Sequence, residues 1–228
     1  SGAPHSLIAS TTGSGKSVLM QNMLLALTKD FSQKDVKVIL IDPKQVDFVE
    51  FSNVPNVTHC TNQEEAIELL KNLVDEMESR YSKFKNCGAK KISQYRKKDI
   101  SINDPMPFVW VFHDEFADWF MDEEYQEKVE TYVNKLGVKA RAAGIYLVFA
   151  TQRPDKDVCP MQLRSNLGNR FILKVADSGT SELALGDKSL GNASELLGRG
   201  HMIAVTETFK GYCQVPYVSE ETLDTWLN

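Results

Sequence analysis

The chain has 228 residues, of which 42% are hydrophobic and 25% charged, with 13 Gly and 8 Pro. This composition is that of an ordinary globular protein, and it excludes a disordered, collagen-like or coiled-coil chain. No apolar run approaches the 18 residues that a membrane helix needs, so we expect no membrane contact within this chain. A formal net charge of -5 argues against a protein that binds nucleic acid through overall positive charge.

Positive charge is concentrated in one segment. Ser79–Lys98 holds eight of the 26 basic residues and no acidic one, so the rest of the chain carries 18 basic residues against all 31 acidic ones. A basic segment on an acidic body is compatible with a polyanion held at one place. The favoured interpretation of the run is nevertheless a solvated helix face with its flanking loop, and the alternative is a patch that faces DNA or a neighbouring subunit. Tyr81 and Phe84, three residues apart, are expected to pack rather than to stack on bases.

Short apolar runs alternate with longer amphipathic segments, which is typical of strand–helix–strand units and a parallel sheet. The expected strands, in chain order, are Ser6–Ser10, Val36–Ile41, Val57–Cys60, Phe108–Phe112, Ile145–Thr151, Arg170–Val175 and His201–Val205, with a further extended segment at Tyr212–Val218. The expected long helices are Lys16–Lys29, Gln63–Lys85 and Glu123–Ala143. Asn62 and Gly88 have the residue types that cap the second helix. Residues 1–228 are expected to form a single domain, excised from a larger protein.

A phosphate-binding motif follows the first expected strand. The segment Ser10–Ser17 reads STTGSGKS and leads into a helix. Its glycines allow successive backbone N–H groups to point at a phosphate, and the start of the helix adds partial positive charge. Lys16 would reach the β- and γ-phosphates of ATP, and the Ser17 hydroxyl would ligate Mg²⁺. Ser10 stands where the motif has its first glycine, and a positive φ there would be disfavoured.

A pair of acids closes the buried strand at Phe108–Phe112. Asp114 would hold Mg²⁺ directly or through water, and Glu115 would orient or deprotonate the water that attacks the γ-phosphate. The alternative is a carboxylate pair that caps a helix. His113 is expected to be a packed strand-end residue. Gln152 closes the strand expected beside this one and could face the γ-phosphate, although any strand can end in a polar turn.

Together these segments resemble the motor domain of FtsK/SpoIIIE-type DNA translocases. The resemblance rests on HSLIASTTGSGKSV, IDPK (Ile41–Lys44), DEFAD (Asp114–Asp118), KARAAGI (Lys139–Ile145) and ATQRP (Ala150–Pro154), and it extends to LLGRGHM at Leu196–Met202. It implies an α/β fold of the RecA-like P-loop NTPase class, with a mostly parallel twisted sheet flanked by helices. It also implies ATP hydrolysis coupled to translocation of double-stranded DNA, and self-association into a hexameric ring.

The resemblance assigns roles to individual residues. It assigns nucleotide binding to Thr12, Gly13, Ser14, Gly15, Lys16, Ser17 and Val18, magnesium to Ser17 and Asp114, and catalysis to Glu115 together with Lys16, Gln152 and Arg141. Gln152 matches the family's γ-phosphate sensor. Arg141 matches the arginine that reaches into the neighbouring subunit's site, whereas its local sequence alone indicates an exposed residue that favours a helix end.

DNA contacts match less completely. Arg153 and Arg164 match the family's basic first pore loop, which follows the TQRP segment. The second pore loop is usually basic too, but here it reads Asp177–Glu182 and has no cation before Lys188. A single ring of phosphate-facing charge would lower the salt dependence of DNA binding.

The leading hypothesis is a ring-shaped, ATP-hydrolysing motor on double-stranded DNA. One alternative is an ATPase of the type VII secretion class that moves proteins, which the acidic second pore loop would suit. Another is an ATP-gated module of a DNA defence or restriction complex. The IDPK and RAAGI segments favour the DNA branch, and the complete set of site residues argues against an inactive domain. We expect a cytoplasmic location, whether or not the parent protein carries a membrane anchor.

Overall fold

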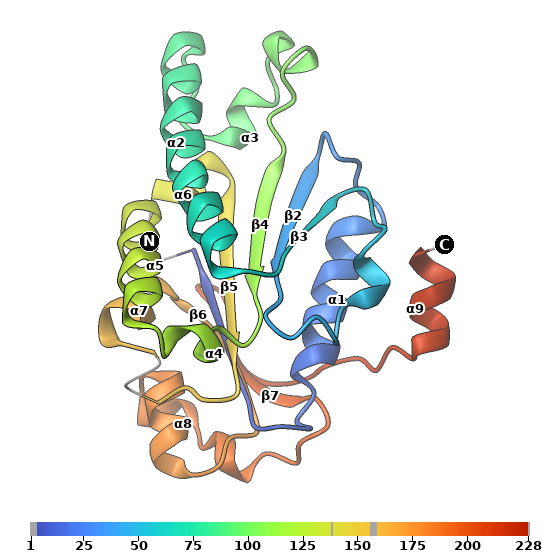
Figure 1. Ribbon diagram of the computed structural model, residues 1–228, viewed down its shortest axis with the longest axis vertical. Helices are drawn as coiled ribbons and strands as arrows, with labels where there is room; N and C mark the ends of the chain where they lie inside the picture. Colours follow the sequence, from blue (N-terminus) through green and yellow to red (C-terminus); the bar gives the residue numbers. More distant parts are fainter. Residues whose placement is uncertain (1–3, 138, 156–158, 228) are drawn as a thin grey trace.

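One mixed sheet organises the molecule (Figure 1). The computed structural model describes residues 4–137, 139–155 and 159–227. Within these residues, eight strands pair in the order β3-β2-β4-β5-β1-β6-β7-β8. Their bounds are β1 Ser6–Ala9, β2 Val36–Ile41, β3 Val57–Cys60, β4 Phe108–His113, β5 Ile145–Thr151, β6 Asn169–Leu173, β7 His201–Val205 and β8 Lys210–Gln214. β1 to β6 are parallel, whereas β7 and β8 are antiparallel to their neighbours. The predicted fold class is confirmed.

The strand order decides which loops meet. β1 lies between β5 and β6, while β4 lies between β2 and β5. The carboxyl ends of β1, β2, β4 and β5 therefore lie along one edge of the sheet, where ligands bind in open parallel sheets. Four strands have the predicted bounds, and the extended segment expected at Tyr212–Val218 instead forms β8, which ends at Gln214.

Helices cover both faces of the sheet. Their bounds are α1 Lys16–Thr28, α2 Gln63–Cys87, α3 Ile92–Tyr95, α4 Phe116–Phe120, α5 Glu123–Leu136, α6 Lys139–Ala143, α7 Met161–Asn166, α8 Ser178–Leu185 and α9 Glu220–Leu227, with short 3₁₀ turns at Val49–Phe51 (η1), Asp99–Ile102 (η2), Lys188–Leu190 (η3) and Ala193–Glu195 (η4). One apolar core joins the sheet to α2, α4, α5, α6 and α7, and a second joins the opposite face to α1 and α9. Figure 1 shows α2 and α5 on the opposite side of the sheet from α1.

The helix ends follow the sequence signals except at one place. Asn62 caps α2 by accepting the N–H of Glu65 at 2.9 Å, and Gly88 ends that helix in a left-handed conformation, as predicted. The single helix predicted over Glu123–Ala143 is wrong, because this stretch forms α5 and α6. Gly137 has a φ of 34°, which breaks the helix and which glycine tolerates better than other residues.

The basic run contains several residues that stabilise the fold. Arg80 is buried and donates to the carbonyl of Ala143 at 2.8 Å. The ring of Phe84 lies 5.8 Å from both Tyr81 and Tyr95, which confirms the packing role predicted for these aromatics. Arg96 forms an ion pair with Asp35 and Lys83 one with Asp104, while Lys85, Lys90, Lys91 and Lys97 are exposed. This arrangement favours the solvated-face interpretation of the run.

Candidate nucleotide site

The loop between β1 and α1 curls at two glycines. Gly13 and Gly15 have φ values of 74° and 106°, in the region that favours glycine. A Cβ built on Gly13 would meet no atom within 4 Å, so this turn is open to a ligand. Ser10, which replaces the motif's first glycine, is fully buried and does not adopt a positive φ. The substitution by serine therefore causes no backbone strain.

The phosphate loop is held from behind by two other parts of the chain. The hydroxyl groups of Thr11 and Ser14 both contact the carbonyl of Lys174, at 3.0 and 3.2 Å. The N–H of Gly200, just before β7, donates to the Ser14 carbonyl at 2.8 Å. A Cβ on Gly15 would lie 2.8 Å from that same nitrogen, so the close approach requires glycine. The loop conformation thus depends on β6 and β7 as well as on its own sequence.

Lys16 and the two acids meet in the interior. The Lys16 ammonium contacts the Asp114 carboxylate and lies 3.2 Å from Oε2 of Glu115, and all three side chains are at least 95% buried. Burial alone would lower the pKa of Lys16, but the charges of Asp114 and Glu115 outweigh it and raise that pKa above its ordinary value. Burial raises the pKa of Asp114 despite the attraction of Lys16. The structure thus brings the three predicted residues together.

Glu115 is positioned by the end of β5. Its Oε1 accepts hydrogen bonds from the Thr151 hydroxyl at 3.0 Å and from the Gln152 N–H at 2.9 Å. The residue precedes α4, but its side chain makes no capping hydrogen bond there, so the helix-cap alternative is wrong for this acid. Its φ of 37° is unusual for a residue with a side chain. Gln152 also touches the phosphate loop, because its Oε1 accepts the Thr12 hydroxyl at 2.6 Å.

His113 is a packed residue, as predicted. It is fully buried, and burial lowers its pKa to about 3, so the imidazole is neutral. Nδ1 lies 3.1 Å from the Asp114 carbonyl and Nε2 lies 2.7 Å from the Tyr125 hydroxyl. A neutral ring satisfies both contacts when Nδ1 donates and Nε2 accepts.

The loop after β2 supplies two charged residues, Lys44 and Asp47, to which sequence reasoning gave no role in the site. The Ser17 hydroxyl donates to Oδ2 of Asp47 at 2.7 Å. The Lys44 ammonium lies 3.8 Å from Oε2 of Glu115 and 3.6 Å from Asp118. The sequence signal that could have revealed them is the polar segment that begins at Asp42 and follows β2. Because β2 pairs with β4 in parallel, the loops after these two strands lie next to each other.

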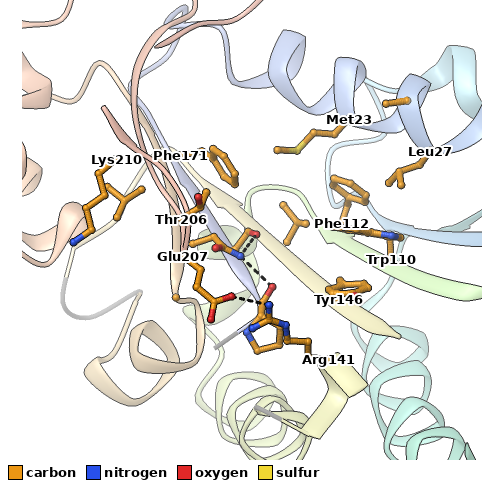
Figure 2. Close-up of a pocket in the computed structure, with 17 residues that line it drawn as sticks. Met23, Leu27, Trp110, Phe112, Arg141, Tyr146, Phe171, Thr206, Glu207 and Lys210 are labelled. Carbon is orange, nitrogen blue, oxygen red and sulfur yellow. Dashed lines mark hydrogen bonds and ion pairs between the residues drawn. The ribbon is translucent and has the colours of Figure 1, made fainter. Parts of the chain in front are cut away.

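Arg141 lies near the amino-terminal end of β5, at the opposite end of the strands from the phosphate loop. It belongs to α6, which precedes β5, whereas the phosphate loop follows the carboxyl end of the adjacent β1. The seven residues of β5 therefore separate it from its own phosphate loop by roughly 20 Å. Arg141 donates to Oε2 of Glu207 at 2.6 Å. Figure 2 shows this pair at the side of a pocket of about 670 Å³, with the rings of Trp110 and Tyr146 among its lining residues.

Comparison with known proteins identifies the family. The sequence model of the FtsK/SpoIIIE family matches residues 1–156. DNA translocase FtsK of Streptococcus pneumoniae (strain ATCC BAA-255 / R6) is 34% identical over 236 residues, which cover 99% of this chain and 30% of that protein. The FtsK of Campylobacter jejuni subsp. jejuni (strain 81-176) is 39% identical over 200 residues, which cover 86% of this chain and 21% of that protein. The chain belongs to the FtsK/SpoIIIE family.

Solved structures agree with this family and its ATPase fold. The pCW3 conjugation coupling protein TcpA, a monomer form with ATPγS, superposes with a TM-score of 0.83 at 29% identity, over 99% of this chain and 64% of that one. The cytoplasmic domain of the type VII secretion ATPase EccC from Thermomonospora curvata gives 0.77 at 25% identity, over 98% of this chain and 27% of that one. The chain is thus an ATPase domain of the FtsK/SpoIIIE family, and it spans about 30% of the streptococcal relative.

The donor atoms at this FtsK/SpoIIIE site suit Mg²⁺ and a nucleotide. Mg²⁺ takes hard oxygen ligands and usually binds one or two protein groups together with substrate phosphates. Ser17, the residue after Lys16, and Asp114, which contacts the Lys16 ammonium, offer such oxygens, and the open turn at Gly13 leaves room for a phosphate. In the part of the chain that the structure describes, no helix is both long and apolar enough to cross a bilayer.

The DNA contacts expected of the family remain predictions. Arg153 is exposed and lies 3.7 Å from Asp155, and the expected first pore loop continues through residues 156–158, which lie outside the described residues. Arg164, on α7, is half-buried and donates to the Leu183 carbonyl at 3.1 Å. The segment expected as a second pore loop instead forms the start of α8, with Asp177 as its cap. Asp177 thus caps the amino-terminal end of α8.

Proposed function

We propose that this chain is the ATP-hydrolysing motor domain, over residues 1–228, of a double-stranded DNA translocase. The buried contact of Lys16 with Asp114 and Glu115 carries the proposal, because it joins a phosphate-binding loop to a metal ligand and a base. The relatives that are 34–39% identical are DNA translocases, which favours DNA as the substrate. Bound Mg²⁺ would neutralise charge on the phosphate oxygens.

The contacts of Glu115 indicate a different role for each of its two carboxylate oxygens. Oε1 is held by Thr151 and Gln152, so it fixes the carboxylate in place. Oε2 faces Lys16 and Lys44. When the Lys16 ammonium turns to a γ-phosphate, Oε2 becomes available to accept a proton from the attacking water. Gln152 contacts both the phosphate loop and Glu115, so it is suited to sense the γ-phosphate.

A ring with shared active sites explains the position of Arg141. Its guanidinium lies at the sheet edge opposite its own phosphate loop, where it serves its own site poorly but can serve the site of an adjacent copy. An arginine supplied in this way neutralises transition-state charge and is worth roughly 10³–10⁵ in rate in comparable enzymes. We propose that six copies form this ring.

The main alternative is a motor that moves proteins. The similarity to EccC, at 25% identity, favours it, as does the acidic start of α8. The higher identity to DNA translocases places this alternative second. An ATP-gated module of a DNA defence complex would use the same nucleotide site without translocation.

ATPase activity with and without duplex DNA tests the proposal. We expect DNA to stimulate hydrolysis by the chain. Lys16→Ala should abolish turnover by removing the phosphate-binding ammonium, and Glu115→Gln should lower turnover by about 10²–10⁴-fold while ATP still binds, since the base is lost. The control is Lys29→Ala, a lysine at the far end of α1. Full turnover in either site variant would overturn the site assignment.

The same assay separates the substrates. Removing the charge of Arg153 or Arg164 should weaken stimulation by DNA and leave the basal rate unchanged, because neither contacts the nucleotide loop. Stimulation by a peptide together with indifference to DNA would favour the protein-moving alternative. Indifference to both would favour the gated module.

A further inference from the structure

We propose that Asp47 is a positioning residue for the divalent cation, acting through the hydroxyl of Ser17. This inference deepens the proposed function, because it rests on ATP and Mg²⁺ binding at the phosphate loop. It assigns a role to the loop between β2 and η1, which neither the phosphate motif nor the acid pair at Asp114 and Glu115 requires.

The hydrogen bond between Ser17 and Asp47 has the direction that metal binding needs. A serine hydroxyl ligates a cation through an oxygen lone pair, so its proton must go to another acceptor. Here the Ser17 hydroxyl donates to Oδ2 of Asp47 at 2.7 Å, which leaves the oxygen lone pairs free for a cation. Outer carboxylates of this kind orient ligand groups and increase their basicity in metal sites.

The loop that carries Asp47 is anchored at both ends. Gln21, one helical turn after Ser17 on α1, donates its side-chain N–H to the Asp47 carbonyl at 3.1 Å. The next residue, Phe48, is fully buried in the core under α1. At the other end, the Asp42 carboxylate accepts the N–H groups of Lys44 and Gln45 at 3.1 and 2.9 Å. Asp47 therefore presents its carboxylate from a fixed backbone.

The charged side chains around the site form two groups, one around Glu115 and one beside Ser17. Lys16 contacts Asp114 and Glu115, and Lys44 directs its ammonium to Glu115 and Asp118 rather than to Asp47. The Asp47 carboxylate thus adds negative charge on the Ser17 side of the loop. A negative charge there attracts a divalent cation and repels a triphosphate to which no cation is bound. Removing it should have opposite effects on nucleotide affinity in the presence and absence of Mg²⁺.

The experiment compares ATPγS affinity in excess Mg²⁺ and in EDTA, measured by calorimetry on the full chain. The wild type should bind more tightly with Mg²⁺. Asp47→Ala removes both the acceptor and the charge, and it should lower affinity in Mg²⁺ by about 10–100-fold while affinity in EDTA is unchanged or higher. Asp47→Glu should restore most of the Mg²⁺ effect, since it retains a carboxylate.

Two further variants separate this role from a structural one. Asp47→Asn has nearly the same shape but no charge, so it should also lose Mg²⁺-dependent affinity if Asp47→Ala does not fold. Asp99→Ala, on an exposed acid in η2, is the control and should match the wild type. An equal loss in Mg²⁺ and EDTA, or no loss in either, would overturn the role of Asp47. Absence of ATPγS binding to the wild type would instead overturn the proposed function.

Discussion

Glu115 combines three features, each of which destabilises the folded state. Its backbone is left-handed with a φ of 37°, which costs a residue with a side chain about 1–3 kcal/mol. Its carboxylate is buried, and it shares Lys16 with a second buried acid. Such strain persists only where the surrounding structure enforces it, here through Thr151 and Gln152 at the end of β5. The conformation aims Oε2 at Lys16, which is consistent with a reactive carboxylate.

A neutral His113 makes stability depend on pH. Burial lowers its folded-state pKa from 6.5 to about 3, so between these values the unfolded chain binds a proton that the folded chain does not. Stability should therefore fall as pH decreases through this window, by roughly 1 kcal/mol per pH unit for this residue. Chemical denaturation at several pH values measures this slope.

His113→Gln isolates the contribution of the imidazole to that slope. The variant should lose stability less steeply with falling pH than the wild type, whatever its stability at pH 7. The change His201→Gln, on a half-buried residue of β7, controls for the loss of a histidine elsewhere. Equal slopes for His113→Gln and the wild type would mean that burial does not keep this imidazole neutral.

Residues differ in how far sequence reveals their position. Lys16 and Glu115 could be predicted to meet, because a motif defines each of them and parallel strands bring their loops to one edge. Asp47 could not, because its contact with Ser17 depends on the path of a loop with no repeating pattern. Arg141 was singled out only by resemblance, and its pairing with Glu207 depends on the turn between β7 and β8.

At the scale of elements, the strands were the most predictable part. β2, β3, β5 and β7 have the predicted bounds. Mostly apolar runs mark β2, β5 and β7, since buried strands tolerate few polar side chains, whereas the edge strand β3 reads VTHC and is only partly buried. The break between α5 and α6 was missed because the apolar spacing continues across it, although Gly137 was a visible signal. The start of α8 was expected as a loop from the family resemblance alone, although Asp177 is of a residue type that caps helices.

The turn before β7 supports the phosphate loop and can be tested at Gly200. This glycine has a φ of 88°, and an added Cβ would lie 2.9 Å from the side chain of Gln214 and 3.0 Å from that of Val215. Gly200→Ala should lower the free energy of unfolding by about 1–3 kcal/mol. It should also weaken ATPγS binding, because the Gly200 N–H holds the Ser14 carbonyl.

Gly198→Ala is the matched control. Gly198 has a similar φ of 80°, but the nearest atom to an added Cβ is 3.9 Å away on Lys174. This variant should show the conformational cost alone, about 1 kcal/mol in thermal or chemical denaturation, with ATPγS affinity retained. Equal affinities for Gly198→Ala and Gly200→Ala would contradict the support of the phosphate loop by this turn.

At the scale of the whole molecule, the proposed ring can be tested by mixing two inactive variants. Arg141→Ala should bind ATP but hydrolyse it slowly, because its own site keeps Lys16 and Glu115. Lys16→Ala lacks phosphate binding but retains Arg141. Where an Arg141→Ala subunit lies next to a Lys16→Ala subunit, the intact nucleotide site of the first can receive the intact arginine of the second. The mixture should therefore regain ATPase activity. No recovery at any mixing ratio would argue against shared sites.

The pairing of Arg141 with Glu207 has an energetic consequence for such an assembly. Both side chains are 46% exposed, and ion pairs in water-accessible positions contribute about 0–1 kcal/mol. In the proposed ring, an arginine held so weakly could leave its carboxylate for a neighbour's γ-phosphate and return after phosphate release with almost no penalty. Glu207 would then give the guanidinium a resting position between successive turnovers.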